Sequence, residues 1–386
     1  MTETASGSPT AMRSARRPTW IELDLGALGR NVAAVVQELG GVPLMAVVKA
    51  NAYGHGAVPV ARTALQSGAS RLATATVGEA LELRQAGINA PIVVLGYTPP
   101  DQVAAAVSAR LAITVFDPQF LDALDRAGQH QGRLATAHVK VDTGMSRLGL
   151  APETLADFVR RAADFSHVDL EGCFTHFRKG EDRAVTLEQL DRFESALAAA
   201  EAAGHRFRVR HAANSAAWRT VPESRLDLVR SGIELLGLRT PDGRQREPIL
   251  SLRATVAQVR TIAPGTAVGY GEGFRAPRRM RVATITVGYG DGFRRSPRNW
   301  GGVLIRGRER PLVGAVSMDL STVDVGELPE VVAGDVATLI GSDGGARLSA
   351  EEVADRLGTV NYEVTTALQA RLPREVSGDG ACGDRE

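Results

Sequence analysis

Residues 44–68 read LMAVVKANAYGHGAVPVARTALQSG. The first five residues of this stretch, 44–48, form a short apolar run that is typical of a buried strand. Residues 58–66 then have the apolar spacing of a helix, and Gly68 follows at a position that favours a left-handed cap. The stretch therefore predicts a strand–helix unit of a parallel sheet, with Lys49 at the end of its strand.

The same unit recurs along the chain as far as residue 250. Further predicted strands span residues 72–76, 92–95, 112–116, 136–142, 168–176, 207–212 and 227–230. Helical segments lie between them, notably at residues 79–86, 152–165 and 187–203. About eight such units predict a (β/α)8 barrel over residues 18–250, although an open doubly wound sheet would give the same local pattern.

After about residue 250 the helical spacing disappears. Short Val/Thr/Ile runs at 254–259, 282–287, 302–305 and 336–340 are separated by Gly, Pro and Asp turns, which predicts a mostly antiparallel β domain over residues 251–375. One helix is expected at 349–357, because Ser349 and Glu352 have the spacing of a capping box. We expect residues 1–17 to form a disordered leader and residues 376–386 a flexible tail.

Composition argues against several classes of function. The net charge of the 386 residues is +1, so no global field indicates nucleic acid as a partner. No stretch approaches the roughly 18 apolar residues of a membrane span, and no metal-binding pattern stands out. The two cysteines, Cys173 and Cys382, are far apart in sequence, which fits a reducing compartment. We therefore expect a cytoplasmic protein without a membrane or nucleic-acid partner.

Lysine is rare in this chain. Only Lys49, Lys140 and Lys179 occur among 45 basic residues. A partly buried lysine can lose its proton and form an imine with a carbonyl, whereas a guanidinium stays charged. Lys49 ends a predicted strand, where parallel barrels place the residues that act, and is thus a candidate for amine chemistry rather than an ordinary strand-end lysine. The last strand ends at Arg230, and the backbone N–H groups after it could hold a phosphate. Together these features suggest pyridoxal phosphate acting on an amino acid.

A series of short motifs gives the chain a recognisable family. They are WIELDL at 20–25, the Lys49 segment, KVDTGMSR at 140–147, THF at 175–177, HAANS at 211–215, VRSGI at 229–233, GYG at 269–271, GYGDG at 288–292, SMD at 317–319 and NYE at 361–363. Over nearly all of its length the chain resembles the alanine racemase family, fold-type III pyridoxal phosphate enzymes. The resemblance implies an isomerase that uses pyridoxal 5'-phosphate to interconvert L- and D-alanine, a peptidoglycan precursor.

The resemblance also implies two bases on opposite faces of the substrate Cα. Lys49 would hold the cofactor as a Schiff base and act on one face, and Tyr270 from a partner subunit would act on the other. A tyrosine needs a neighbouring cationic group to lower its pKa, and His176, linked towards Arg230 and His211, would help to do this. Such sharing implies a homodimer with two composite sites.

Other implied roles concern the cofactor ring and the substrate carboxylate. Arg230 would donate a hydrogen bond to the ring nitrogen without supplying a proton, which favours racemisation over decarboxylation. Lys140 is either a strand salt-bridge partner of Asp142 or a carbamylated lysine that orients Arg147. The remaining implied contacts are Tyr53, Asn214, Ser215, Gly232, Ile233 and Tyr362 for the cofactor, Met318 and Tyr289 for the substrate, and Asp319 in support. A buried core tyrosine is the competing interpretation of Tyr362.

Some positions depart from the family pattern. Residues 178–182 read RKGED where small residues are usual, Ala315 replaces an arginine of the access channel, Ser231 replaces a proline, and Leu235-Leu236 replaces Met-Tyr. These changes are either neutral, or they tune the channel for serine or a broader range of amino acids, or they mark a paralogue of a biosynthetic cluster with altered inhibitor sensitivity. A non-racemising pyridoxal phosphate-binding homologue remains as an alternative, and the β domain with Tyr270 argues against it. A transcriptional or binding module is the other alternative, and the absence of a basic face and the density of site residues argue against that one.

Overall fold

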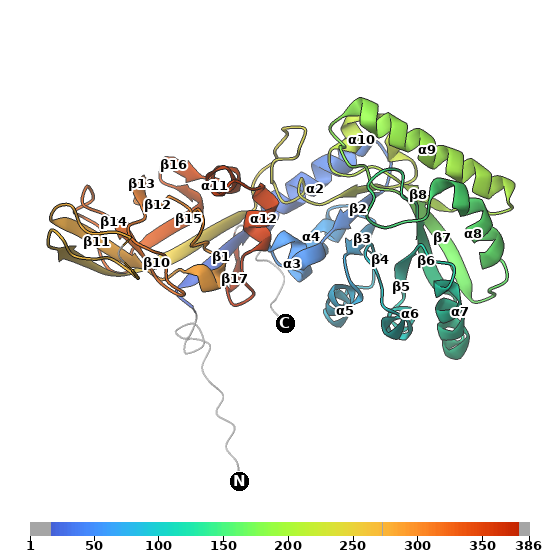
Figure 1. The fold of residues 1–386 in the computed structure, drawn as a ribbon, viewed down its shortest axis with the longest axis horizontal. Coiled ribbons are helices and arrows are strands. Elements are labelled where there is room, and N and C mark those ends of the chain that lie inside the picture. Colours follow the sequence, from blue (N-terminus) through green and yellow to red (C-terminus); the bar gives the residue numbers. More distant parts are fainter. Residues whose placement is uncertain (1–16, 272, 378–386) are drawn as a thin grey trace, which may run out of the picture. The chain divides into compact units, whose positions relative to one another are not determined.

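The computed structural model describes residues 17–271 and 273–377 and divides them into two compact units (Figure 1). One unit spans residues 25–248. The other combines the described residues up to Asp24 with those from Ile249 onward. Residues 1–16 of the predicted leader and 378–386 of the predicted tail, including Cys382, lie outside the described residues. No described helix has the length and apolar character needed to cross a bilayer.

The first unit is a parallel β-barrel. Its strands are β2 (Leu44–Val47), β3 (Arg71–Thr74), β4 (Ile92–Val94), β5 (Leu111–Val115), β6 (Ala135–Lys140), β7 (Val168–Phe174), β8 (Val209–His211) and β9 (Val229–Ser231). The strands follow one another from β2 to β8, and β9 pairs with β2, so the last strand lies beside the first. Between β8 and β9, Arg230 N–H donates to Ala213 O over 3.3 Å. The nearly closed ring confirms the predicted (β/α)8 barrel.

Helices surround these strands (Figure 1). They are α2 (Leu25–Leu39), α3 (Lys49–Tyr53), α4 (Ala57–Gln66), α5 (Val77–Gln85), α6 (Val103–Ser108), α7 (Phe120–Gln131), α8 (Leu155–Ala162), α9 (Arg183–Ala202) and α10 (Ala217–Thr220), with short 3-10 turns at Pro100–Gln102, Pro152–Thr154 and Pro222–Arg225. Every residue of β4 and β5 is buried, because helices cover one face and barrel side chains fill the other. Met45, Ala73, Val93 and Ala112 from four adjacent strands form one buried cluster.

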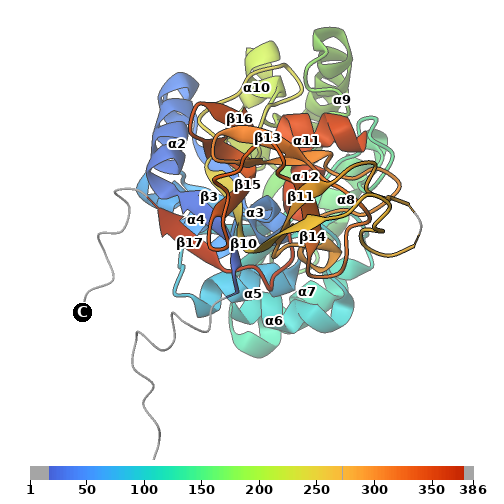
Figure 2. The ribbon, with the colours of Figure 1, turned by 90° about the vertical axis from the view of Figure 1, so that its left-hand side faces the viewer.

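The second unit is built on a nine-stranded sheet (Figure 2). Its strands are β1 (Thr19–Asp24), β10 (Leu250–Ile262), β11 (Met280–Ile285), β12 (Gly302–Ile305), β13 (Arg308–Pro311), β14 (Ser321–Asp324), β15 (Val336–Asp343), β16 (Ala346–Leu348) and β17 (Arg374–Ser377). The unit also contains α11 (Ala350–Leu357), α12 (Asn361–Thr366) and a 3-10 turn at Tyr289–Asp291. Its strand pairs are antiparallel except β1 with β17, which confirms a mostly antiparallel domain.

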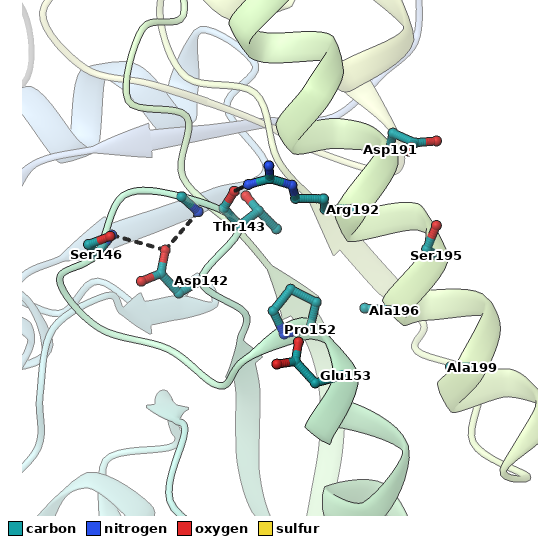
Figure 3. A pocket seen from close by; sticks show the side chains of 11 residues that line it. Asp142, Thr143, Ser146, Pro152, Glu153, Asp191, Arg192, Ser195, Ala196 and Ala199 are labelled. Atoms are coloured by element: carbon teal, nitrogen blue, oxygen red, sulfur yellow. Dashed lines mark hydrogen bonds between the residues drawn. The ribbon is translucent and has the colours of Figure 1, made fainter.

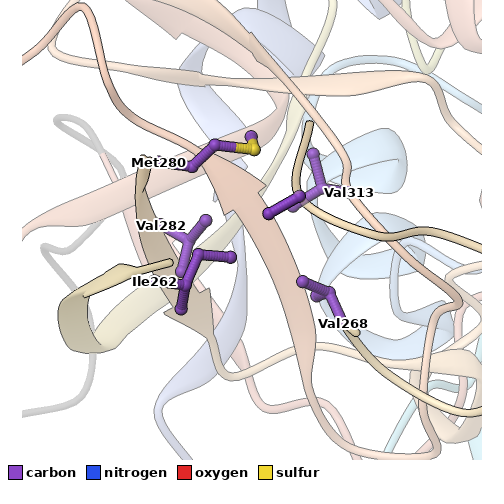
Figure 4. Close-up of a cluster of buried hydrophobic side chains, with 6 residues drawn as sticks. Ile262, Val268, Met280, Val282 and Val313 are labelled. Atoms are coloured by element: carbon purple, nitrogen blue, oxygen red, sulfur yellow. The ribbon is translucent and has the colours of Figure 1, made fainter. Parts of the chain in front are cut away.

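Local packing in this unit follows the sequence pattern. Ile262, Met280 and Val282 from β10 and β11 pack with Val268 and Val313 in a buried apolar cluster (Figure 4). The predicted capping box is present at the start of α11. There, the backbone N–H of Glu352 donates to the Ser349 hydroxyl over 3.1 Å, and the Glu352 carboxylate accepts from the Ser349 N–H over 2.7 Å.

The predicted boundaries need correction at both ends. Residues 19–24 were expected in the barrel, but they form β1, which pairs with β10 and β17. Burial alternates along β1, as in a half-exposed antiparallel strand, whereas a barrel strand is buried on both faces. Arg17, predicted to end the leader, forms an ion pair of 2.7 Å with buried Asp291. Val376 and Ser377, predicted to begin the tail, belong to β17.

Candidate active site

Lys49 stands just beyond the carboxyl end of β2, and the segment labelled α3 that starts with it is a left-handed turn rather than a regular α-helix. Ala50, Asn51, Ala52 and Tyr53 all have φ between 51° and 53°, the left-handed helical region. This conformation costs a non-glycine residue about 1–2 kcal/mol, so the surroundings must hold the turn. Two hydrogen bonds do so: Ala57 N–H donates to Asn51 Oδ1 over 2.7 Å, and Ala50 N–H donates to Glu79 Oε1 over 2.8 Å.

The amine of Lys49 lies among other cations. Burial lowers its pKa, and the positive charge of Arg147 lowers it further. Burial and Arg147 likewise lower the pKa of Lys140 to about 8. The Nζ of Lys140 lies 5.4 Å from the centre of the Phe174 ring. Because the neutral amine is the nucleophilic form, this environment prepares both lysines for reaction with a carbonyl carbon.

Asp142 organises the loop that carries Arg147. Its Oδ1 accepts hydrogen bonds from the backbone N–H groups of Gly144, Met145 and Ser146 over 2.9, 2.8 and 3.1 Å. The bond from Ser146 is drawn in Figure 3. Burial raises the pKa of Asp142, but these three bonds outweigh it and lower the pKa overall. Across residues 17–271 and 273–377, no ion pair joins Lys140 to a carboxylate, so the alternative of a Lys140–Asp142 salt bridge is not found. Arg147 itself is exposed.

A cavity of about 590 Å³ lies between this loop and α9 (Figure 3). It is lined by residues of the loop, of the segment before α8, and of α9, and Arg192 donates to the carbonyl oxygen of Thr143 across it over 3.2 Å. Neither Lys49 nor Arg230 lines this cavity. The amine cluster and the cavity are therefore separate features of the barrel.

Arg230, in the middle of β9, is buried and nearly saturated with hydrogen bonds. Its Nη1 donates to Nδ1 and to the carbonyl oxygen of His211 over 2.8 and 2.9 Å, and its Nη2 donates to the carbonyl oxygens of Thr175 and Ala212, each over 2.9 Å. Burial lowers the pKa of Arg230 to about 10. A guanidinium has five N–H donors. Among the described residues Nε has no partner, so one donor remains for a ligand.

His176 lies beside Arg230, with its Nδ1 3.5 Å from Arg230 Nη2. Burial, and then the positive charge of Arg230, lower the pKa of His176 to about 3. The imidazole is therefore neutral at physiological pH. The part of His176 in lowering the pKa of Tyr270, through its link towards Arg230 and His211, stays a prediction.

The predicted phosphate residues of the barrel lie together. The Gly232 N–H donates to the Ser215 hydroxyl over 3.2 Å. A Cβ on Gly232 would lie 2.9 Å from the Tyr53 hydroxyl, so glycine is needed for this close approach. Ile233 follows Gly232 directly. Asn214 Oδ1 accepts hydrogen bonds from the backbone N–H groups of Ala216 and Ala217 at the start of α10, and its predicted contact with the cofactor stays a prediction.

The other predicted site residues belong to the second unit. Tyr270, Tyr289, Met318 and Tyr362 are 68%, 42%, 53% and 38% exposed, which is unusual for large apolar side chains and is incompatible with a core role for Tyr362. The guanidinium of Arg295 lies 6.0 Å from the Tyr270 ring centre.

Two ion pairs support the Met318 segment in this unit. Arg371 donates to Asp319 Oδ1 over 2.7 Å and to Asp291 Oδ1 over 2.8 Å. Gly290 N–H donates to the Met318 carbonyl oxygen over 2.9 Å. Sequence reasoning gave neither residue a role: Asp291 was quoted only as part of the GYGDG motif at 288–292, and nothing in the local pattern separates Arg371 from an ordinary surface charge. Across the described residues, no group of His, Cys, Asp and Glu side chains could hold a metal ion.

Comparison with known proteins places this geometry in a family. The model of the alanine racemase N-terminal domain matches residues 23–240, and that of the C-terminal domain matches residues 249–376. An alanine racemase from Desulfovibrio desulfuricans is 43% identical over 94% of this chain and 99% of its own length, and one from Symbiobacterium thermophilum is 43% identical over 95% and 98%.

Solved structures agree. The alanine racemase from Bacillus anthracis with bound L-Ala-P has a TM-score of 0.89 at 36% identity and covers 94% of this chain and 96% of that one. The alanine racemase of the D-cycloserine producer Streptomyces lavendulae has a TM-score of 0.88 at 36% identity, covering 94% and 98%. Both domain models, nearly complete relatives and matching folds lead to one conclusion: the chain belongs to the alanine racemase family.

Proposed function

We propose that this chain is a pyridoxal 5'-phosphate-dependent racemase that interconverts L- and D-alanine. The observation that carries the proposal is the arrangement at the barrel strand ends. There, Lys49 has a lowered pKa, and Arg230 keeps one N–H donor without a partner among the described residues. Family membership supports the same reaction.

The residues present fit the proposed cofactor. Lys49 would bind its aldehyde carbon, and Arg230 Nε–H would donate to its ring nitrogen. Its phosphate would be held by Tyr53, the Ser215 hydroxyl and the backbone at Gly232, where a side chain would fill the space. Bound pyridoxal phosphate would supply an electron-withdrawing system that acidifies the Cα proton of an attached amino acid.

Arg230 would determine the reaction type. A guanidinium donates a hydrogen bond but keeps its proton, so the ring nitrogen would stay unprotonated and electron withdrawal would be limited. His176 is neutral and is no alternative proton source. Limited withdrawal would favour prompt reprotonation at Cα over other reactions, and a proton delivered on the face opposite to the one that lost it would give racemisation.

Two bases would handle that proton. The Lys49 amine would act on one face of Cα, and Tyr270 of the partner subunit on the other, since inversion requires proton transfer on opposite faces. Exposed Tyr270 and Met318 support a contribution from a second copy of the chain. The proposed active form is therefore a homodimer with two shared sites.

The substrate carboxylate would be bound by Arg147 and by the Met318 backbone of the partner subunit, with Tyr289 nearby. Lys140, whose lowered pKa leaves part of its amine neutral, would be carbamylated and would orient Arg147. We further propose a cytoplasmic location and a role in supplying D-alanine for peptidoglycan.

Single substitutions test the two bases. Lys49→Ala should abolish racemisation in both directions, and Tyr270→Phe should slow it while pyridoxal phosphate stays bound. Mixing the two variants should restore activity, because half of the mixed sites would contain both bases. Wild-type turnover in Tyr270→Phe, or no recovery after verified subunit exchange, would contradict the mechanism.

A racemase of the same family tuned to serine or to a broader range is the second candidate. The charged RKGED segment at 178–182 favours it, because small residues are usual at these positions in the family. Its backbone is held in place: Arg178 N–H donates to Gln189 Oε1 over 3.0 Å, and the Lys179 carbonyl accepts from Thr186 over 3.0 Å, while both side chains are exposed. Loss of optical rotation from single L-amino acids, measured on the purified protein, separates the two candidates.

A further inference from the structure

Arg230 is one end of a hydrogen-bonded chain through the barrel interior. Its Nη1 lies 2.8 Å from His211 Nδ1, and His211 Nε2 lies 2.8 Å from His138 Nδ1. His138 Nε2 lies 3.0 Å from Glu171 Oε2. Arg71 closes the chain with two bonds to the Glu171 carboxylate, of 3.2 and 2.8 Å. Both imidazoles are fully buried and shielded from water, whereas the Arg71 and Glu171 side chains at the far end are 21% and 16% exposed.

Arg230 and Glu171 determine the direction of every hydrogen bond between them. A guanidinium only donates and a carboxylate only accepts. Glu171 must therefore accept from His138 Nε2–H, His138 Nδ1 must accept from His211 Nε2–H, and His211 Nδ1 must accept from Arg230. Burial is the largest cause lowering the pKa of both histidines, so each ring is neutral and has the single N–H that this assignment needs.

Strand β7 departs from regular geometry at Glu171, where the hydrogen-bonded side chains reach it. Ala137 pairs with Leu170 and His138 pairs with Gly172, which makes Glu171 the extra residue of a β-bulge. Bulges redirect side chains and are frequent beside active sites. A Cβ on Gly172 would lie 2.5 Å from His138 Nδ1, so the glycine leaves room for the His138 ring. Regular strand pairing is thus interrupted at Glu171, the residue whose carboxylate contacts His138.

We propose that Glu171 is a positioning residue that acts through His138 and His211 to hold Arg230, leaving the Arg230 Nε–H for the cofactor ring. The inference rests on the proposed function. With the opposite tautomers, the N–H of His211 would face the N–H of Arg230 and displace the guanidinium. Arg230 has no carboxylate partner of its own among the described residues, and aligned neutral rings in a dry interior connect it to the negative charge of Glu171.

A neutron structure of the full-length chain tests the bond directions directly. Deuterium should lie on Nε2 of both His138 and His211, with Nδ1 bare. Deuterium on Nδ1 of either ring would overturn the proposal. This readout does not use activity, so a wrong assignment of the reaction would leave it unchanged and would show itself instead as absent alanine turnover.

Two matched variants test the effect on Arg230. Glu171→Gln removes the charge at constant size, and Asp169→Asn removes a carboxylate from the same strand whose partner is Arg208, on the exposed side. Relative to Asp169→Asn, Glu171→Gln should lower kcat about tenfold or more with KM for alanine changed less than about twofold, as outer partners of a site residue do. It should also shift the pH titration of the bound cofactor absorbance.

Equal kcat and an unchanged titration in both variants would refute the positioning role. A loss confined to KM would refute it as well, because Arg230 is proposed to act on the ring and not on the substrate. If Glu171→Gln does not fold, the neutron map of the unmodified chain decides alone.

Discussion

The left-handed turn after Lys49 predicts a stability change of unusual sign. Ala50 is exposed, has φ 51° and ψ 51°, and uses only its backbone in the hydrogen bond to Glu79. Glycine adopts this conformation without strain, so Ala50→Gly should remove a penalty of about 1–2 kcal/mol. The greater freedom of glycine in the unfolded chain offsets about 0.5–1 kcal/mol of this gain. The expected net stabilisation is about 0.5–1 kcal/mol.

Ala33 in α2 is the matched control. It is also exposed but lies in a right-handed helix, where glycine destabilises by about 1 kcal/mol. For a unit of this size 1 kcal/mol corresponds to about 2–4 °C in Tm, so the two variants should move Tm in opposite directions. Thermal unfolding of the cofactor-free chain at fixed concentration measures both. Ala50→Gly should also lower turnover, because a looser turn positions Lys49 less well.

A decrease in Tm for Ala50→Gly similar to that for Ala33→Gly would refute the strain argument. The turn would then be a conformation that its sequence adopts at no penalty. An unchanged turnover combined with a higher Tm would leave the strain argument intact but would show that the strain does not serve the position of Lys49.

Three further predictions concern Gly232, Lys140 and the pH dependence of stability. Gly232→Ala should lower affinity for pyridoxal phosphate at least about tenfold, because its Cβ would lie 2.9 Å from the Tyr53 hydroxyl, and equilibrium dialysis measures this. Lys140 should gain the mass of one CO2 in bicarbonate buffer, and no mass change in the intact protein would contradict the carbamate. Lys140→Ala should lose activity, and small carboxylates should partly restore it by replacing the negative charge beside Arg147.

Stability should decrease as pH falls. Burial and the charge of Arg230 lower the pKa of His176 in the folded chain to about 3, from an ordinary value of 6.5. Between these two pH values the unfolded chain binds a proton at His176 and the folded chain does not, so protonation favours unfolding. The urea midpoint should therefore decrease as pH falls below 6.5. Glu171, at about 2 against 4.5, adds a second loss below 4.5, which Glu171→Gln should remove.

The barrel was predictable from sequence because its signal repeats. Every strand from β2 to β9 lies within or next to a predicted range, since a buried parallel strand needs a continuous apolar run and the helix after it needs a regular spacing. The strand at 19–24 reads TWIELD, without the continuous apolar run of a barrel strand, and its pairing partners decide to which unit it belongs. Those partners, β10 and β17, are more than 200 residues away along the chain, so no local pattern shows them.

The site was predictable as a set of residues but not as a geometry. Lys49, Arg230 and Gly232 stand out because barrel strand ends carry function. Neither the left-handed turn at 50–53 nor the bulge at Glu171 has a sequence signature, because Ala and Glu are ordinary residues there and tertiary contacts impose the conformation. His138 reads as an alternating strand residue, and its contact with His211 depends on the register of three strands.

The charges around Lys49 suggest why this family would carry a modified lysine at position 140. Burial lowers the pKa of Lys140 most, and the charges of Arg147, Arg230 and Lys49 lower it further, while Asp142 raises it. Four cationic groups thus share one barrel mouth with Asp142, whose Oδ1 also accepts from three backbone N–H groups. Like charges at such distances repel, and the repulsion falls only if a group loses its charge or an anion enters. A carbamate would do both at Lys140, since it removes a positive charge and adds a negative one beside Arg147. The repulsion between these cations also lowers the pKa of Lys140, so part of its amine is neutral, which is the form that reacts with CO2. The positive charges around Lys140 would therefore favour its carbamylation.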